Sequence, residues 1–145
     1  MSDVLTLSQI KMPGTARSKD DAIRETGEIL VDVGAVTPAY IDSMFERERS
    51  VSTYMGNYLA IPHGTNESKE SIKRSALSVI RYPEPIDWDG NEVLFALGIA
   101  GYQGGHMDIL SRIAIVFSDT DEVDKLVAAK SAQEIYDLLN AVNEE

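Results

Sequence analysis

The two histidines are the side chains best suited to covalent chemistry, because the chain contains no cysteine. His63 stands in the run Ala60-Ile61-Pro62-His63-Gly64-Thr65, and His106 stands in Gly104-Gly105-His106-Met107-Asp108. An imidazole keeps an unprotonated fraction near neutral pH, so it can attack phosphorus, and the P–N bond that forms is labile enough to be passed on. Histidine phosphate chemistry is therefore one interpretation. An ordinary loop position is the alternative for each histidine.

The sequence around each histidine predicts how it is positioned. Pro62 ends a strand and Gly64 allows a sharp turn, which leaves the His63 imidazole at a rigid strand end. His106 is expected at the start of a helix, where unpaired backbone N–H groups favour an anion. A transferring phosphoryl group needs such donors and positive charge. Arg47 and Arg49, in the charged run that ends a predicted helix, are candidate cations, although that run also fits a solvated helix end.

Other classes of site lack their signatures. Two distant histidines with scattered carboxylates show no metal-ligand spacing, so we expect no metal. The serine-hydrolase elbow, the P-loop and the dinucleotide-binding glycine pattern are all missing from the sequence, so we expect no cofactor.

Hydrophobic periodicity predicts helices at both ends of the chain. The first is expected to begin at Ser18 and to stop at Gly34, and the second to begin with Thr37 as N-cap and Pro38 at its first position. After Met107 three more are expected, the last starting at Ser131. Leu110, Ile113, Ala114 and Phe117 are expected on one face of the first of these three.

Strands are expected between these helical regions. Short apolar or β-branched runs predict strands at Tyr58–Ile61, Ala76–Tyr82 and Val93–Ala100, after an extended start at Val4–Met12. The segment Pro83–Gly90 between the two longer runs is predicted to be a loop and turn. Helices before and after a block of strands predict an α/β fold, a single sheet with helices packed against it.

Length and charge limit the organisation and the partners. The 145 residues suit a single domain spanning residues 1–145. A formal charge of −11 repels nucleic acid and anionic lipid, so neither is an expected partner. No apolar run is long enough for membrane insertion, and the N-terminal segment does not resemble a secretory signal, so we expect the cytoplasm.

The stretch Thr53–Thr65 resembles the active-site signature of the mannitol/fructose-type enzyme IIA domain of the phosphoenolpyruvate-dependent sugar phosphotransferase system. The similarity extends through nearly the whole chain, including the Tyr82-Pro83-Glu84 segment and the Gly105-His106 pair. Mannitol-type members resemble the chain best. The resemblance implies one mixed β-sheet flanked by helices on both faces, the architecture of an enzyme IIA domain.

The resemblance also implies the site and the partners. In this family the histidine before Gly-Thr is phosphorylated, which corresponds to His63, and it is paired with a second histidine and an arginine. These correspond to His106 and to Arg47, with Arg49 left open. Gly64 and Thr65 are expected to contribute phosphoryl-binding donors. HPr would be the phosphoryl donor, and the enzyme IIB component of a mannitol, polyol or fructose permease would be the acceptor. Apart from the resemblance, we expect Nε2 of His63 to receive the group, with Nδ1 held by a backbone or side-chain partner.

Two other functions remain open at this stage. Enzyme IIA domains also occur as regulators, including a nitrogen-related branch in which phosphorylation controls a bound partner. Asn57 stands where mannitol members often carry an acidic residue, which weakens the sugar assignment. A small acidic scaffold without chemistry is the third interpretation.

Overall fold

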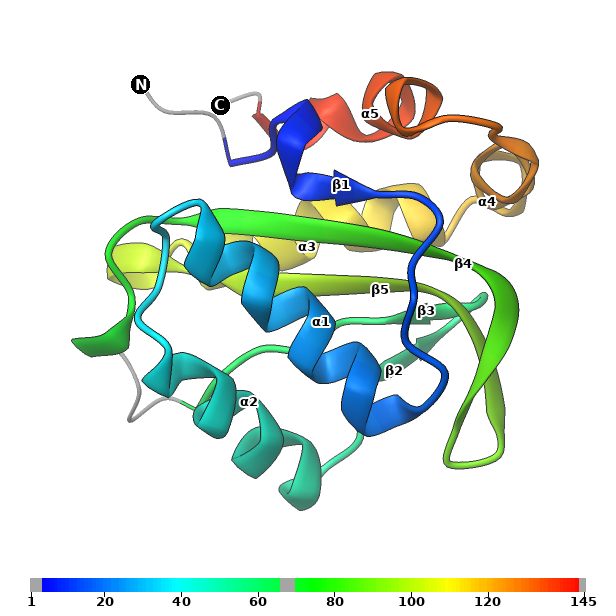
Figure 1. The fold of residues 1–145 in the computed structure, drawn as a ribbon. Helices are drawn as coiled ribbons and strands as arrows, with labels where there is room; N and C mark the ends of the chain where they lie inside the picture. The colour runs from blue at the N-terminus through cyan, green and yellow to red at the C-terminus, as the bar shows by residue number, and fades with distance from the viewer. Residues whose placement is uncertain (1–3, 66–69, 144–145) are drawn as a thin grey trace.

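The computed structural model describes residues 4–65 and 70–143. Within these two segments the strands form one mixed sheet of five, in the order β1-β4-β5-β3-β2 (Figure 1). The β1–β4 and β3–β5 pairs are parallel, whereas β4–β5 and β2–β3 are antiparallel. The strands are β1 (Ile10–Lys11), β2 (Tyr54–Gly56), β3 (Leu59–Ala60), β4 (Ala76–Trp88) and β5 (Asn91–Ala100).

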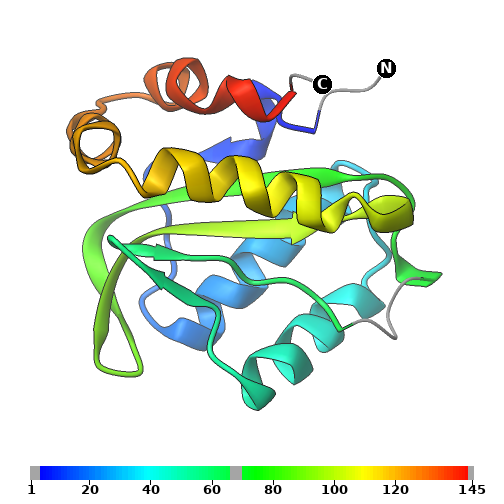
Figure 2. The same cartoon turned by 180° about the vertical axis from the view of Figure 1, so that it is seen from behind.

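Helices cover both faces of this sheet. The helices α1 and α2 lie on one face (Figure 1), and α3, α4 and α5 lie on the other side (Figure 2). The predicted α/β class, with helices on both faces of a mixed sheet, is confirmed. The helices are α1 (Lys19–Asp32), α2 (Ala39–Ser50), α3 (His106–Phe117), α4 (Thr120–Ala128) and α5 (Ala132–Leu139), with 3-10 turns η1 (Leu7–Gln9), η3 (Tyr102–Gly104) and η4 (Asn140–Asn143).

The central hairpin of β4 and β5 is longer than the sequence predicted. The ladder runs from the Ala76–Ala100 pair to the Trp88–Asn91 pair. The prediction of a loop over Pro83–Gly90 is wrong for its first part, because β4 continues to Trp88. The register of the ladder shifts between Arg81 and Ile86. The exposed prolines lie within this shift, where the regular hydrogen bonds of the ladder are interrupted, so the N–H groups that proline lacks are not needed there. The turn itself, at Asp89-Gly90, is confirmed.

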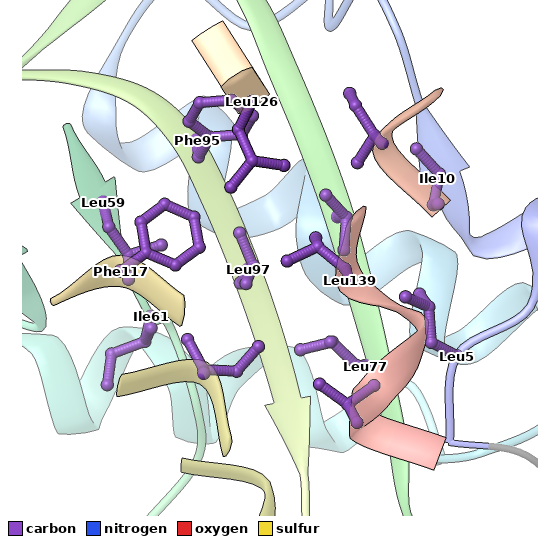
Figure 3. Close-up of a cluster of buried hydrophobic side chains, with 14 of the residues drawn as sticks. Leu5, Ile10, Leu59, Ile61, Leu77, Phe95, Leu97, Phe117, Leu126 and Leu139 are labelled. Atoms are coloured by element: carbon purple, nitrogen blue, oxygen red, sulfur yellow. The ribbon is translucent and has the colours of Figure 1, made fainter. Parts of the chain in front are cut away.

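The alternation of side chains along β4 and β5 builds two cores. Leu77 and Leu97 face the side of α3, α4 and α5, where they pack with Phe117, Leu126 and Leu139 (Figure 3). The residues next to them in sequence point to the other face and pack against α1 and α2. Both faces of the central strands are therefore buried, which explains why β5 is apolar nearly throughout.

Capping agrees with the sequence for two helices and differs for a third. The side chains of Ser18 and Ser131 each accept a hydrogen bond from the backbone three residues on, so these predicted starts of α1 and α5 are confirmed. Thr37 is not the N-cap of α2, since Pro38 holds that position and no side chain caps it. Thr37 instead accepts the Tyr40 N–H through its backbone carbonyl.

The predicted buried side of α3 is confirmed at Ile113 and Phe117, whereas Ile109, which was not predicted, is buried more fully than Leu110 and Ala114. Ile109, Ile113 and Phe117 are its buried residues, whereas Leu110 and Ala114 are half-buried. No helix in the part of the chain that the structure describes has the length and apolar character for crossing a bilayer.

Glu25 of α1 fastens the segment before that helix to the sheet. Its carboxylate accepts hydrogen bonds from Lys11 Nζ at 2.8 Å, Thr15 Oγ1 at 2.7 Å and Tyr82 Oη at 2.8 Å. It also accepts from the backbone N–H groups of Thr15 and Ala16. Burial alone would raise the pKa of Glu25, but the hydrogen bonds outweigh burial and lower the pKa to about 2.

We expect Glu25→Gln to lower the free energy of unfolding at pH 7 by about 1.5–3 kcal/mol, the usual contribution of hydrogen bonds to a charged group. The contribution of a carboxylate with a lowered pKa is fully present above its ordinary value of 4.5 and is lost as the pH falls toward about 2. Denaturant titrations at pH 7 and pH 3 measure this difference, which should shrink at pH 3. Glu28→Gln, at an exposed position of the same helix, is the control. Equal differences at the two pH values would contradict the assignment.

Candidate functional site

His63 is held in the sheet by backbone pairing directly after β3. The Ile61 N–H donates to Thr53 O at 3.0 Å, and the Ile99 N–H donates to Pro62 O at 2.9 Å. His63 itself forms an isolated parallel bridge with Ile99 of β5. Its side chain is buried, with 9% of the residue exposed. The imidazole is therefore fixed by the sheet rather than by a free loop, as the strand-ending proline predicted.

The tautomer of His63 follows from its hydrogen bond. Nδ1 lies 2.7 Å from the carbonyl oxygen of Ile61, two residues earlier. A carbonyl oxygen can only accept, so Nδ1 carries the proton and Nε2 keeps its lone pair. The ring thus presents one nucleophilic nitrogen, Nε2, in a fixed orientation.

His106 lies beside His63 and comes from a different part of the fold. It is the first residue of α3, and the two ring centroids are 4.7 Å apart, with the planes tilted by 46°. Gly101 makes this placement possible, because a Cβ there would lie 2.2 Å from the His106 backbone nitrogen. Gln103 in the intervening turn has φ 51°. A tight turn after β5 thus brings the start of α3 back to the end of β3.

Arg47 lies in the last turn of α2, and its positive charge acts on both imidazoles. Its charge lowers the pKa of His63 and of His106. Its Nη1 donates to Val51 O at 2.6 Å, which fixes the guanidinium against the turn that follows the helix. Arg49 is exposed two positions further along, on a different side of α2. Of the two arginines that the sequence left open, the structure brings Arg47 to the histidines.

Burial and charge keep both imidazoles neutral. Burial is the main reason that the pKa of His63 is lowered to about 4. The hydrogen bond to Ile61 O and the charge of Glu48 oppose this shift, while His106 and Arg47 add to it. Burial, followed by Arg47, also lowers the pKa of His106. At neutral pH an incoming anion would therefore meet two neutral rings beside a fixed guanidinium.

Gly64 and Thr65 lie directly after His63 and are half-buried. The Gly64 N–H, which the sequence assigned to phosphoryl binding, donates to Tyr40 Oη at 2.9 Å. Tyr40 Oη in turn donates to Ile99 O at 2.7 Å. Burial raises the pKa of Tyr40 to about 12, against the effect of the Gly64 hydrogen bond, so this hydroxyl stays protonated. Tyr40 thereby joins α2, β5 and the residue after His63.

Glu48 is the residue of the site that the sequence reasoning missed. It belongs to a charged run predicted as solvated, yet it is only 6% exposed. Its carboxylate accepts from Thr53 N at 2.8 Å, Thr53 Oγ1 at 2.5 Å and Trp88 Nε1 at 3.2 Å. The signal was in the spacing, because Tyr40, Met44 and Glu48 recur every four residues and so share the buried side of α2.

Residues 4–65 and 70–143 contain no group of three histidine, aspartate or glutamate side chains that could hold a metal ion. The chemistry that the described residues can support is nucleophilic attack by Nε2 of His63 on an electrophile that carries negative charge. Arg47 and the neutral His106 imidazole are placed to stabilise such a group.

Comparison with known proteins decides the family. A family model described as phosphoenolpyruvate-dependent sugar phosphotransferase system, EIIA 2, matches residues 3–142. The chain belongs to this family. The resemblance predicted from the segment that contains His63 is thus confirmed, and the enzyme IIA chain is a component of a phosphotransferase system.

Named relatives of this enzyme IIA chain cover nearly its full length. The mannitol-specific phosphotransferase enzyme IIA component of Halalkalibacterium halodurans is 51% identical over 141 residues, which is 97% of each chain. The crystal structure of IIA mannitol from Escherichia coli is 30% identical, with a TM-score of 0.86, and the match covers 93% of this chain and 98% of that one. The complex of IIA mannitol with phosphorylated enzyme IIB mannitol from the same organism gives a TM-score of 0.86 at 29% identity, over 93% of this chain and 96% of that one.

We expect Arg47→Gln to raise the pKa of both His63 and His106, because the substitution removes a cation that disfavours their protonation. The pKa of His63 should rise from about 4 but stay below 6.5, since burial, the main cause of the lowered pKa, remains in the variant. A pH titration followed by NMR of the ring protons measures both values. Arg49→Gln, at an exposed position, is the matched control and should leave both unchanged. Equal shifts in the two variants would mean that Arg47 has no special access to the imidazoles.

Proposed function

We propose that the chain is a phosphocarrier of sugar uptake, in which His63 accepts a phosphoryl group from phospho-HPr. His63 then donates the group to the enzyme IIB component of a mannitol permease, or of a related polyol or fructose permease. The observation that carries this proposal is the fixed, unprotonated Nε2 of His63 beside His106 and Arg47. Relatives named mannitol-specific, and a similar protein seen in complex with phosphorylated enzyme IIB, support enzyme IIB of a mannitol permease as the partner.

The first transfer exchanges one P–N bond for another. Nε2 of His63 attacks phosphorus in line with the leaving imidazole of phospho-HPr; the bond from phosphorus to that imidazole breaks as the bond to Nε2 forms. The electron pair of the broken bond returns to the HPr ring. Nδ1 of His63 keeps its proton, which it donates in the hydrogen bond to Ile61 O throughout, so the step needs no proton transfer by this chain. The second transfer repeats the exchange with enzyme IIB as the acceptor.

Arg47 and His106 form no covalent bond during the transfer; they stabilise the negative charge of the phosphoryl group. A loose transition state spreads negative charge over the equatorial oxygens of the phosphoryl group. Arg47 offers a fixed guanidinium, and the His106 imidazole offers an N–H donor; both stabilise that charge without reorganisation. Because His63 is neutral above about pH 4, its nucleophilic form predominates at neutral pH. We assign Gly64 a structural part in this site, because its N–H is held by Tyr40.

The cytoplasm is the compartment that this role requires, since the proposed donor and acceptor domains act there. The regulatory alternative and the inert scaffold have no comparable support. The relatives named above are called mannitol-specific, and a scaffold would not need a pair of neighbouring histidines, one of them buried, beside an arginine.

Incubation with enzyme I, HPr and phosphoenolpyruvate should place one acid-labile phosphate on the chain, at Nε2 of His63. His63→Ala should take up none, because the nucleophile is gone. Phosphate incorporation and phosphorus NMR of the phosphoimidazole measure this. Arg49→Gln, whose side chain is exposed, should be labelled like the wild type. Acid-labile phosphate on the His63→Ala variant would contradict the proposal.

Mannitol uptake separates transport from regulation. Expression of the chain in cells that lack their own mannitol enzyme IIA should restore uptake, and the His63→Ala variant should not. Normal labelling by HPr without rescue would favour the regulatory alternative.

We expect His106→Gln to slow phosphoryl transfer from phospho-HPr by about 100-fold, the usual effect of losing one donor to a developing anion. The variant should still be phosphorylated at His63, because Nε2 and its orienting hydrogen bond remain. Rapid-quench kinetics at pH 7 measure the rate. An unchanged rate would remove His106 from the proposed mechanism.

A further inference from the structure

A buried carboxylate that the proposed mechanism does not use lies next to its arginine. Glu48 follows Arg47 in sequence, but the two side chains hold opposite ends of the same short connection between α2 and β2. Arg47 Nη1 bonds Val51 O at 2.6 Å, and Glu48 bonds the backbone N–H and the hydroxyl of Thr53. Removal of either contact would loosen the connection that carries the other.

From Glu48 a continuous set of hydrogen bonds reaches the nucleophile. Glu48 holds Thr53, Thr53 O accepts the Ile61 N–H at 3.0 Å, and Ile61 O accepts from Nδ1 of His63 at 2.7 Å. The carbonyl that fixes the tautomer of His63 is thus oriented through a strand start that Glu48 anchors. Trp88 Nε1 fixes the carboxylate from the far side, at the tip of the β4–β5 hairpin.

The charge of Glu48 also acts on the site. The charges that act on His63 are the imidazole of His106 on α3 and, on α2, the cation of Arg47 and the anion of Glu48, and only that anion favours protonation of the ring. Lys19 of α1 approaches the carboxylate at 3.6 Å, but Lys19 also pairs with Asp89 at 2.8 Å, so it does not neutralise Glu48 fully. A phosphoryl group on His63 would add about −1.5 to −2 charges to this surrounding at pH 7, by analogy with other phosphorylated side chains.

We propose that Glu48 is a positioning residue of the phosphoryl-transfer site, which holds the Arg47 turn and the Ile61 carbonyl in register and keeps the phosphoryl group on His63 easy to transfer. The inference rests on the proposed function. Geometrically, Glu48 holds Thr53, and through this residue it stabilises both the turn that binds Arg47 and the strand that orients His63. Electrostatically, its negative charge raises the free energy of the phosphorylated state, so that the group passes on readily. Without this anion, Arg47 would hold the phosphoryl group more tightly.

Glu48→Gln tests the charge, because glutamine keeps the shape and one acceptor oxygen. The quantity to compare is the equilibrium constant for phosphoryl transfer from phospho-HPr to His63. We expect this constant to be threefold to tenfold larger for the variant than for the wild type. A role limited to stability would not favour the phosphorylated form. Quantification of both phosphoproteins after mixing measures the constant. Glu46→Gln, which removes an exposed charge from the same helix, is the matched control and should behave like the wild type.

Thr53→Val tests the geometry, because it removes the hydroxyl that binds Glu48 and leaves the charge in place. We expect transfer from phospho-HPr to slow by about tenfold with the equilibrium constant unchanged. This variant also keeps the inference testable should Glu48→Gln fail to fold, as judged by circular dichroism. An equilibrium constant equal to that of the wild type in folded Glu48→Gln, or a normal rate in Thr53→Val, would overturn the role of Glu48. If the wild type itself takes no phosphate from phospho-HPr, the proposed function is overturned, and this inference falls with it.

Discussion

The hydrogen bond between Nδ1 of His63 and the carbonyl of Ile61 is the constraint on which the rest of the site depends. The bond selects the tautomer, and the tautomer decides which nitrogen keeps a lone pair. Its acceptor is a backbone atom, so its direction can change only if the strand moves. The parallel pairing of β3 with β5, continued by Pro62 and His63 against Ile99, prevents that movement. The central sheet, buried on both faces, thus fixes the direction of Nε2 of His63.

The other members of the site reach that atom from outside the strand. α2 brings Arg47 at its C-terminal end, and the turn after β5 brings His106 at the first position of α3. Neither placement depends on a flexible side chain searching for a partner, since Arg47 is tied to Val51 and His106 is fixed by the close approach of Gly101. The electrostatic result is local. Although the chain has a net charge of −11, the cation of Arg47 acts on the two neutral imidazoles, and the carboxylate of Glu48 is buried nearby on the same helix.

The sequence predicted the parts of this arrangement that have local causes. Proline after an apolar run placed His63 at a strand end, serine caps located the starts of α1 and α5, and β-branched runs located β4 and β5. The nearness of Arg47 and His106 to His63 rested on resemblance, because contacts across 16 and 43 residues of sequence have no local signature. Single-residue rules failed where tertiary context changed the outcome. The prolines after Tyr82 suggested a loop, but a register shift accommodates them within the hairpin. The charges around Glu48 suggested solvent, but the period of α2 buries that carboxylate.

The edges of the sheet have a consequence for how the protein meets others. Among the described strands the long pair β4 and β5 lies inside, and the outermost strands β1 and β2 have two and three residues. Such short outermost strands are themselves poor templates for a further strand, because each offers few unpaired peptide groups. A carrier that must leave one protein before it meets the next gains from outermost strands that are too short to hold a visiting strand firmly.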